Sequence, residues 1–291
     1  MLPFTNTQLI AIIMIVLTFT LILFAGAAIA GLIGSLTGLG GGVVLIPLLT
    51  LVFKVDIHYA IGTSLISVIA TSSGAAAAYV KEGITNIRLG MFLELATTIG
   101  AIMGAVLAKH VSTSLIAIIF GIMLLVSAIT SFIHQEDKID GGSPGRLSTW
   151  LQLNNTYPTG TGPKSYIVHH VAGGFVMMNI AGIVSGLLGI GSGALKVIAM
   201  DRIMRIPFKV STTTSNFMIG VTAAASAGIY LKEGYIDPGL SMPVVLGVLL
   251  GAFIGSKILF RAQTKVLKIL FAIIISVLAV EMIYNGITHK L

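Results

Sequence analysis

The chain has 291 residues, of which 56% are hydrophobic and only 9% are charged, and its mean hydropathy is +1.03. A soluble domain carries about 25% charged residues, so this composition excludes a soluble globular protein and predicts a multi-pass protein of the cell membrane, with the lipid bilayer as its surroundings. The net charge of +7 is not taken as a sign of a nucleic-acid partner, because the lysines and arginines lie mainly at the ends of apolar runs, where they orient membrane helices.

Apolar runs recur along the chain, and each is long enough to cross a hydrocarbon core of about 30 Å as a helix. They lie at 9–30, 57–80, 89–108, 115–133 and 266–283. Because backbone groups in lipid must find partners within the chain, the runs predict an all-α, polytopic membrane helical bundle. A polar stretch interrupts them and contains the single tryptophan, Trp150. We interpret 134–165 as a polar linker loop between a first transmembrane repeat, 1–133, and a second one, 166–291.

The two repeats match at a constant offset of 151 residues. The sharpest match sets Tyr79, Lys81, Glu82 and Gly83 against Tyr230, Lys232, Glu233 and Gly234. Other pairs are Gly31 with Gly182, Gly38 with Gly189, Gly40 with Gly191, Gly42 with Gly193, Ser64 with Ser215, Gly100 with Gly251 and Gly104 with Gly255. A repeat of this length in an apolar chain is typical of a transporter built from two homologous halves, with its site where the halves meet.

The basic residues indicate how the two halves are inserted. If the chain turns back at each glycine cluster, the second half is inverted, and the loops at 81–88, 134–165, 201–209 and 257–268 share one face of the membrane. That face then carries twelve lysines and arginines, and the other face carries four. If the chain instead passes straight through each cluster, the halves are parallel and the same residues divide nine to seven. Positive residues concentrate on the cytoplasmic side, so the count favours inverted repeats with both termini outside.

Each half contains a glycine cluster followed by a short apolar piece. The clusters are Gly38-Leu-Gly-Gly-Gly42 and Gly189-Ile-Gly-Ser-Gly193, and the pieces are 43–53 and 194–204. We interpret them as glycine-broken helical hairpins, since glycine permits a sharp turn within the membrane. The N-terminus of the following helix presents free N–H groups and a partial positive charge, which suit an anion. The alternative is close helix packing through small residues.

Lys196 lies three residues after Gly193, and its counterpart by the offset is Leu45. A cation in the first turn of a helix within the membrane is unfavourable unless a negative group lies beside it. The same turn contains no carboxylate, so we expect an anionic substrate there. The alternatives are that Lys196 extends to the membrane surface or pairs with an acid of another helix, such as Glu94.

Polar residues open the next helix of each half, as Thr63 and Ser64 in the first and as Thr214, Ser215 and Asn216 in the second. In inverted halves these groups could converge on one ligand near the midplane. The alternative is that they cap or bond their own helices. Glu94 is the acidic residue well inside a span, and we regard it as a candidate proton carrier, although Arg88 is only two turns away.

Signatures of an enzyme are weak. With no cysteine, the chain has no disulfides, thiolate metal sites or cysteine nucleophiles. The six histidines are scattered and lack acidic partners at metal-ligand spacing, so neither a metal site nor a catalytic triad is predicted. The glycines at 38–42 are not followed by Gly-Lys-Ser/Thr, and therefore no nucleotide or other cofactor is expected.

The doubled motif, Gly31-Leu-Ile-Gly-Ser-Leu-Thr-Gly-Leu-Gly-Gly-Gly with Pro47 and Gly62-Thr-Ser-Leu behind it, resembles the TauE/SafE family of sulfite and organosulfonate exporters. Its second copy runs from Gly182 to Gly193 and continues with Thr214-Ser-Asn. The resemblance implies a permease for small sulfur-containing anions such as sulfite, thiosulfate or organosulfonates. The chain departs from the family pattern at two positions of the second copy. Ser192 lies within the glycines, and Ile198 lies where the first copy has Pro47.

The residue pattern and the resemblance together define an expected substrate site served by alternating access. It comprises Gly40, Gly41, Gly42, Thr63, Ser64, Gly191, Ser192, Gly193, Lys196, Thr214, Ser215 and Asn216. Two other functions remain open: a passive anion channel that uses the same site, and a membrane accessory protein whose glycines serve only packing.

Overall fold

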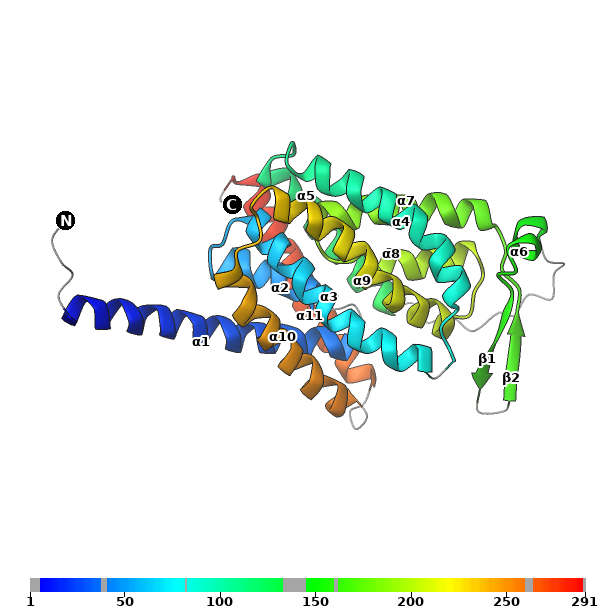
Figure 1. Cartoon of the computed structure of the whole chain (residues 1–291), viewed down its shortest axis with the longest axis horizontal. Coiled ribbons are helices and arrows are strands. Elements are labelled where there is room, and N and C mark those ends of the chain that lie inside the picture. Colours follow the sequence, from blue (N-terminus) through cyan, green and yellow to red (C-terminus); the bar gives the residue numbers. More distant parts are fainter. Residues whose placement is uncertain are drawn as a thin grey trace.

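The computed structural model describes residues 6–37, 41–81, 83–132, 145–159, 162–259 and 264–289. The first part of the chain forms α1 (Asn6–Thr37), α2 (Gly42–Pro47), the π-helical turn η1 (Leu48–Val52), α3 (Ile57–Lys81), α4 (Ile87–Ala108) and α5 (Thr113–Phe132). Next come α6 (Arg146–Trp150), β1 (Asn155–Thr159) and β2 (Gly162–Tyr166). The remainder forms α7 (Val171–Leu188), α8 (Gly193–Ile198), the π-helical turn η2 (Ala199–Ile203), α9 (Phe208–Lys232), α10 (Pro238–Leu259) and α11 (Thr264–Ile287). The fold is therefore mostly helical (Figure 1).

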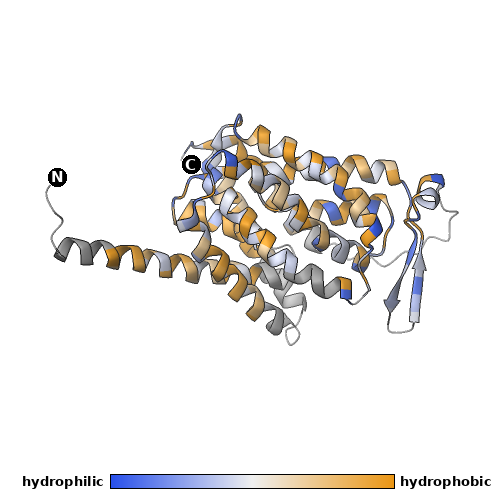
Figure 2. Ribbon diagram, in the orientation of Figure 1, coloured by the Kyte–Doolittle hydropathy of each residue, from blue (hydrophilic) through white to orange (hydrophobic). Residues whose placement is uncertain are grey.

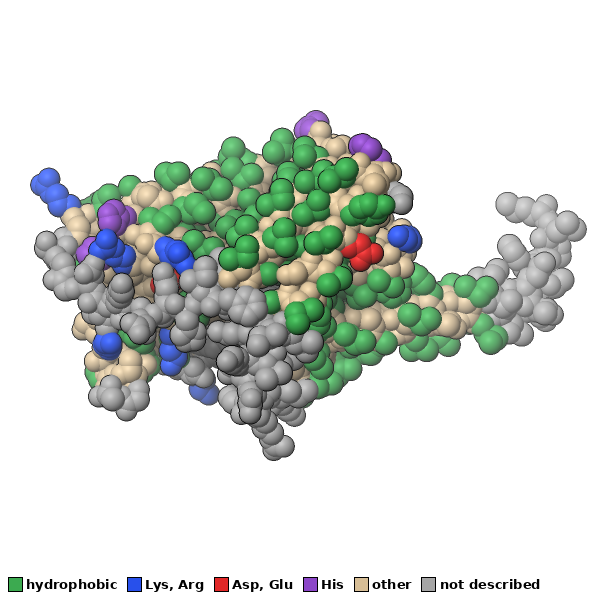
Figure 3. All heavy atoms as spheres, turned by 180° about the vertical axis from the view of Figure 1, so that it is seen from behind, with side chains coloured by type: hydrophobic (Ala, Val, Ile, Leu, Met, Phe, Trp, Pro, Cys, Tyr) green, Lys and Arg blue, Asp and Glu red, His purple; other side chains and the backbone are tan. Residues whose placement is uncertain are grey.

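Four helices of the described chain are long and apolar enough to cross a membrane, in α1, α4, α7 and α10. Shorter apolar helices lie at Gly42–Val52, Thr113–Ile129 and Ala272–Ile287. The helices are apolar outside as well as inside: in α4, Leu89 and Leu93 are buried, whereas Met91 and Leu95 are more than 60% exposed. Hydrophobic residues dominate the helices in Figure 2 and cover the middle of the face in Figure 3. A surface of this kind needs lipid around it, which confirms the membrane prediction.

The helices pack in pairs, α1 with α10, α4 with α7, α5 with α11 and α3 with α9. Glycine makes several of these contacts close. A Cβ atom at Gly104 of α4 would overlap the carbonyl oxygen of Ile183 in α7, and one at Gly251 of α10 would overlap that of Ala28 in α1. Small residues let helix backbones approach in a membrane, where lipid competes with any larger apolar side chain. Close packing therefore accounts for many of the repeated glycines.

The central pair, α3 and α9, buries more hydroxyl groups than any other helix of the described chain. The buried ones are Thr63, Ser64, Ser67 and Ser72 in α3, and Ser211, Thr213, Thr214, Ser215, Thr222 and Ser226 in α9. A helix with this many polar side chains is costly to expose to lipid, so it is enclosed by more apolar neighbours. The polar interior of the bundle lies along these two helices.

Contacts between loops define two ends of the bundle. At one, which we call the hairpin end, the Asn86 side chain donates to the Leu153 carbonyl at 2.9 Å, and the His169 N–H donates to the Met204 carbonyl at 3.0 Å. At the opposite end Lys109 pairs with Glu233 at 3.4 Å. Figure 1 shows the start of α1 and the end of α11 on the side away from the β-strands.

The β-hairpin is a feature that the all-α prediction missed. β1 and β2 pair antiparallel, with Asn155 opposite Tyr166 and Thr159 opposite Gly162. Tyr157 and Tyr166 are buried, with ring centroids 6.0 Å apart, and belong to the same apolar cluster as Leu153. The Asn86 side chain also donates to the Tyr166 hydroxyl at 2.8 Å. The hairpin is thus fastened to the start of α4.

Candidate functional site

The second glycine cluster forms a sharp turn between α7 and α8. Gly189 has φ +68° and caps α7, Gly191 has φ +71°, and Ser192 has φ +44° and precedes α8. Three left-handed residues within four positions reverse the chain inside the bundle, which a helix cannot do. Ser192 adopts this conformation although its side chain disfavours it, so the surrounding structure must hold it there.

The first cluster meets the second one. Residues 38–40, and with them the predicted site residue Gly40, lie outside the described chain. Helix α2 begins at Gly42. A Cβ atom at Gly42 would come 2.6 Å from the Ser64 hydroxyl oxygen and 3.5 Å from the Gly189 carbonyl oxygen. The Ser64 hydroxyl in turn donates to that carbonyl at 3.0 Å. Gly42, Ser64 and the turn after α7 therefore form one contact, which we call the junction.

Helix α9 covers the other side of the junction. The Ser215 hydroxyl donates to the carbonyl of Gly193 at 3.3 Å. Cβ atoms at Gly191 and Gly193 would both come within 3 Å of the Ile219 side chain. The first turn of α8 is therefore held against α9 at a distance that only glycine permits.

Ser192 leaves an unused hydrogen-bonding group in this region. Its side chain is 3% exposed, and its hydroxyl oxygen has no hydrogen-bond partner among the described residues. A buried hydroxyl without a partner costs free energy, so such groups are rare unless a ligand or water completes them. Ser192, which departs from the glycine pattern of the cluster, thus places a hydroxyl group without a partner among the described residues just before α8.

Lys196 is fully buried, with 0% exposure, and its Nζ donates to the Thr222 hydroxyl of α9 at 2.5 Å. The Thr222 hydroxyl donates in turn to Oε1 of Glu94, on α4, at 2.7 Å. Side chains on a helix lean toward its N-terminus, so the lysine amine lies beside the start of α8. Of the alternatives that the sequence left open, the structure therefore places Glu94 nearest to Lys196, with one hydroxyl between them. Thr222 also lies one helical turn after Ile219, which contacts the junction.

Glu94 is 8% exposed and accepts a second hydrogen bond, from the Thr98 hydroxyl to Oε1, at 3.1 Å. Its other oxygen, Oε2, is buried and has no partner among the described residues. Arg88, which the sequence offered as a neighbour, bonds instead to the Gln152 side chain at 2.5 Å. Glu94 therefore belongs to the interior of the bundle.

Other predicted residues point away from the junction. Thr63 bonds to Ser241 of α10 at 3.3 Å, and the Thr214 hydroxyl accepts from the Asn86 N–H at 3.1 Å. A Cβ at Gly41 would meet Val248 of α10 at 2.9 Å. Asn216 is half-buried. Thr63, Thr214 and Gly41 thus serve packing in this conformation.

Sequence reasoning missed Thr222 and Thr98. A signal existed for both, because Thr222 lies two turns after Ser215 and Thr98 one turn after Glu94, so each shares a helix face with a residue already singled out. Among the described residues there is no group of three His, Asp or Glu side chains that could hold a metal ion.

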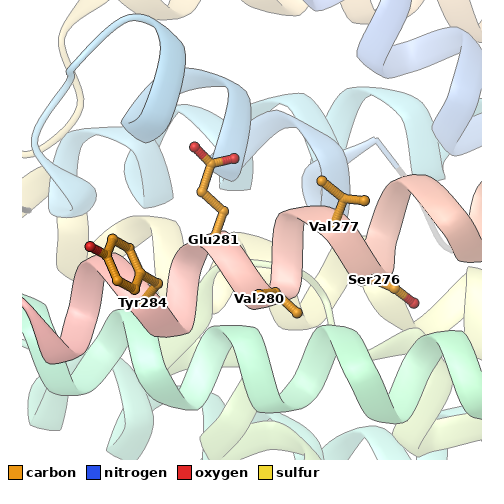
Figure 4. Close-up of a pocket in the computed structure, with 5 residues that line it drawn as sticks. All are labelled: Ser276, Val277, Val280, Glu281 and Tyr284. Atoms are coloured by element: carbon orange, nitrogen blue, oxygen red, sulfur yellow. The ribbon is translucent and has the colours of Figure 1, made fainter.

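Two surface cavities are lined by other residues. At the hairpin end, a polar cavity of about 360 Å³ is lined by Thr85, Asn86, Ile87, Arg88, Gln152, Asn154 and Asn155. On α11, an apolar groove of about 500 Å³ is lined by Ser276, Val277, Val280, Glu281 and Tyr284. Figure 4 shows the Glu281 and Val277 side chains pointing to the same side of α11.

Comparisons with known proteins match this architecture to a family of transporters. Residues 23–282 match the family described as Sulfite exporter TauE/SafE. The chain is 27% identical to "Probable membrane transporter protein YunE" and 28% identical to "Probable membrane transporter protein YdhB", both of Bacillus subtilis (strain 168). The first alignment covers 89% of this chain and 95% of the relative, and the second covers 85% and 92%. A third relative, "Probable membrane transporter protein ORF9" of Sinorhizobium sp, is 24% identical over 92% of this chain and 94% of its own length.

No solved structure matches the chain. The family match extends from within α1 to within α11 and so includes the junction, Lys196 and Glu94. The family is one of transporters and not of enzymes, in line with the apolar helices described above. The chain therefore belongs to the TauE/SafE sulfite exporter family and is an integral membrane protein of the transporter class.

Proposed function

We propose that the protein is a membrane permease for small sulfur-containing anions, such as sulfite, thiosulfate or organosulfonates, and that it works by alternating access at the junction. The observation on which this depends is Lys196, a fully buried lysine at the start of α8. A buried ammonium group needs an anionic partner, and the positive end of the helix dipole attracts the same kind of partner. A transported anion would satisfy both.

The groups around the start of α8 are hydrogen-bond donors, as an oxyanion requires. The Ser192 hydroxyl has no partner among the described residues, and Lys196 has three N–H donors of which one reaches Thr222. The backbone N–H groups in the first turn of α8 lack partners within their own helix. A sulfonate or sulfite carries three oxygen acceptors on one sulfur, so it can accept from several of these donors at once.

We assign the remaining residues by the contacts described above. In the proposed site, Gly42, Gly191 and Gly193 let the backbone approach the anion, with Gly40 as part of the same cluster. Ser64 and Ser215 orient it, while Gly41, Thr63, Thr214 and Asn216 would contribute only after the helices have moved. The sulfur in the substrate is inferred from the family description, whereas the negative charge is inferred from Lys196.

Alternating access requires two elements that move against each other, and we propose that they come from inverted repeats, 1–133 and 166–291, joined by the linker 134–165. Four helix bounds support this: α2 and α8 begin 151 residues apart, and so do α3 and α9. The packing supports it as well, since α1 pairs with α10 and α7 pairs with α4. The start of α3 lies at the opposite end, where His58 is within 3.4 Å of the Ala108 carbonyl, whereas Thr214 near the start of α9 contacts Asn86 at the hairpin end.

The proposal is tested by thermal unfolding of the purified protein in detergent with sulfite, thiosulfate, isethionate, taurine, sulfate, chloride and a neutral amino acid. A ligand that binds only the folded state stabilises it by about 2.7 kcal/mol at 100 times its dissociation constant. We expect stabilisation by at least one sulfur oxyanion and none by the amino acid. The control is the double variant Lys196→Met with Glu94→Gln, which removes both buried charges and should unfold at the same temperature with every solute.

The results also separate the other two functions. A protein that no anion stabilises, and that transports none of them in liposomes, would be an accessory protein whose glycines serve packing. A channel would bind the same anions but would conduct a current that a carrier cycle is too slow to produce. Either result would contradict the permease.

A further inference from the structure

Lys196, Thr222 and Glu94 connect three separate helices through hydrogen bonds. The lysine is on α8, the threonine on α9 and the glutamate on α4. The two contacts are 2.5 Å and 2.7 Å long, and the three residues are 0%, 0% and 8% exposed. The Thr222 hydroxyl has one proton and two acceptors within reach, Glu94 Oε1 at 2.7 Å and the Met218 carbonyl at 3.0 Å. With the proton on the shorter and charged contact, the hydrogen bonds run from the cation to the carboxylate.

These two charges are isolated from other charged groups of the elements that pack around them. Helix α7, which packs along α4, contains no charged residue between Val171 and Leu188. In α9 the lysines are at its ends, Lys209 and Lys232. Arg88 bonds to Gln152 at the hairpin end, and Asp201 and Arg202 lie in η2, more than a turn beyond Lys196. In this state Glu94 therefore supplies the negative charge that Lys196 requires.

The carboxylate is only half satisfied. Both of its hydrogen bonds, from Thr222 and Thr98, go to Oε1, and Oε2 is buried without a partner among the described residues. An ionised oxygen in this situation loses its hydration and gains nothing in exchange, so it is poorly stabilised. The Thr222 and Thr98 hydroxyls donate to Oε1, and Lys196 supplies the counter-charge of the carboxylate through Thr222. A different anion at Lys196 would take this counter-charge away from Glu94.

We propose that Glu94 is an internal anion that occupies Lys196 between transport cycles, and that each transported monovalent anion replaces it while Glu94 takes up one proton. This inference depends on the proposed anion permease function. On arrival, the substrate oxygens accept from the Lys196 ammonium, and Glu94 is released from its counter-charge. A proton from the water on the open side then forms an O–H bond at Oε2.

The exchange keeps the charge of the site balanced. Before it, the ammonium group faces one carboxylate; after it, the same group faces one substrate anion, and Glu94 is neutral. When the anion leaves on the other side, the proton leaves Oε2 for the water there, and the bridge through Thr222 forms again. One monovalent anion thus moves together with one proton, and no net charge crosses the bilayer. The coupling ion of the transporter is then the proton.

The test uses the whole protein in liposomes, with labelled isethionate as the anion and a pH-sensitive dye inside. Isethionate is a monovalent sulfonate that does not titrate near neutral pH, so any proton movement reports on the protein. For the unaltered protein we expect one proton for each isethionate, and accumulation of isethionate by about tenfold for each pH unit of an inward proton gradient. A membrane potential should have no effect on accumulation.

Glu94→Gln removes the internal anion but leaves Lys196 in place. We expect this variant to exchange isethionate across the bilayer, to bind it at least about fivefold more tightly because no carboxylate competes, and to move no protons. The matched control is Glu281→Gln, which alters an exposed carboxyl of α11 that belongs to neither the junction nor the bridge. The control should keep the proton coupling of the unaltered protein.

Two results would overturn the inference. One is transport of isethionate by the unaltered protein without protons, a measurement that does not depend on whether any variant folds. The other is proton coupling in Glu94→Gln at the ratio of the unaltered protein. If the unaltered protein carried no isethionate, and none of the other sulfur anions, the proposed function itself would be wrong.

Discussion

Charge removal at Lys196 and Glu94 should show that the two residues depend on each other. Lys196 is 0% exposed and Glu94 is 8% exposed, so water screens neither charge. Removing one partner of a buried ion pair leaves the other charge uncompensated, which destabilises a protein by about 3–5 kcal/mol. We therefore expect Lys196→Met and Glu94→Gln, made separately and measured without substrate, each to lower the free energy of unfolding by about this amount.

The double variant should be far more stable than the two single losses imply. With both charges gone, what is lost is mainly the two hydrogen bonds through Thr222, at about 1 kcal/mol each. We therefore expect a coupling energy above about 3 kcal/mol in a double-mutant cycle. The free energies are to be measured by equilibrium unfolding in mixed detergent. Effects that add to within about 0.5 kcal/mol would refute the bridge.

Three further predictions concern the same structure. Thr222→Val keeps the side-chain volume but removes the bridging hydroxyl, so thermal unfolding should show a free energy of unfolding lower by about 1–3 kcal/mol. Thr222→Ser keeps the hydroxyl and should lower the free energy of unfolding less. Equal losses in the two variants would exclude a role for the hydroxyl. Gly104→Ala should lower the free energy of unfolding by about 1–3 kcal/mol, because the new Cβ atom overlaps the Ile183 carbonyl oxygen. In the control Gly228→Ala the new Cβ atom meets nothing within 4 Å, so its midpoint of thermal unfolding should stay unchanged and lie above that of Gly104→Ala. The hydrogen bond from the His58 side chain lowers the pKa of Asp56, which precedes α3. The ionised Asp56 carboxylate therefore stabilises the fold at neutral pH, and this stabilisation is lost as the pH falls through the lowered pKa. Asp56→Asn should remove this loss on the acid side in unfolding curves measured against pH.

Much of the helical architecture could be predicted from the sequence. Length and apolarity alone indicate the membrane helices, because lipid forces their backbones to be satisfied internally. The left-handed turn at Gly189 and Gly191 was also predictable, since glycine is the residue that adopts it at least cost. The β-hairpin was not, because its strands are short, polar and partly exposed, and they depend on the tertiary contact between Asn86 and Tyr166.

The candidate site was predicted in outline. The junction residues Gly42 and Ser64 come from the sequence and meet the turn after α7, and Ser215 bonds to Gly193, three residues before Lys196. Thr63 and Thr214, although they are neighbours of the two serines, point elsewhere, because adjacent positions on a helix face different directions. The helix face of Thr222 could be read from its spacing to Ser215, but its partners could not, since they depend on the rotation of α9 relative to α4 and α8, which no local pattern specifies.

The central claim is that the protein transports small sulfur oxyanions at a site that requires Lys196. The most direct measurement is exchange of labelled isethionate in liposomes preloaded with the unlabelled anion, for the unaltered protein and for the double variant Lys196→Met with Glu94→Gln. The double variant removes both buried charges and so is expected to fold. We predict saturable exchange by the unaltered protein, which sulfite and thiosulfate inhibit and a neutral amino acid does not, and no exchange by the double variant. Equal exchange by both proteins, or none above protein-free liposomes with any sulfur anion, would contradict the claim.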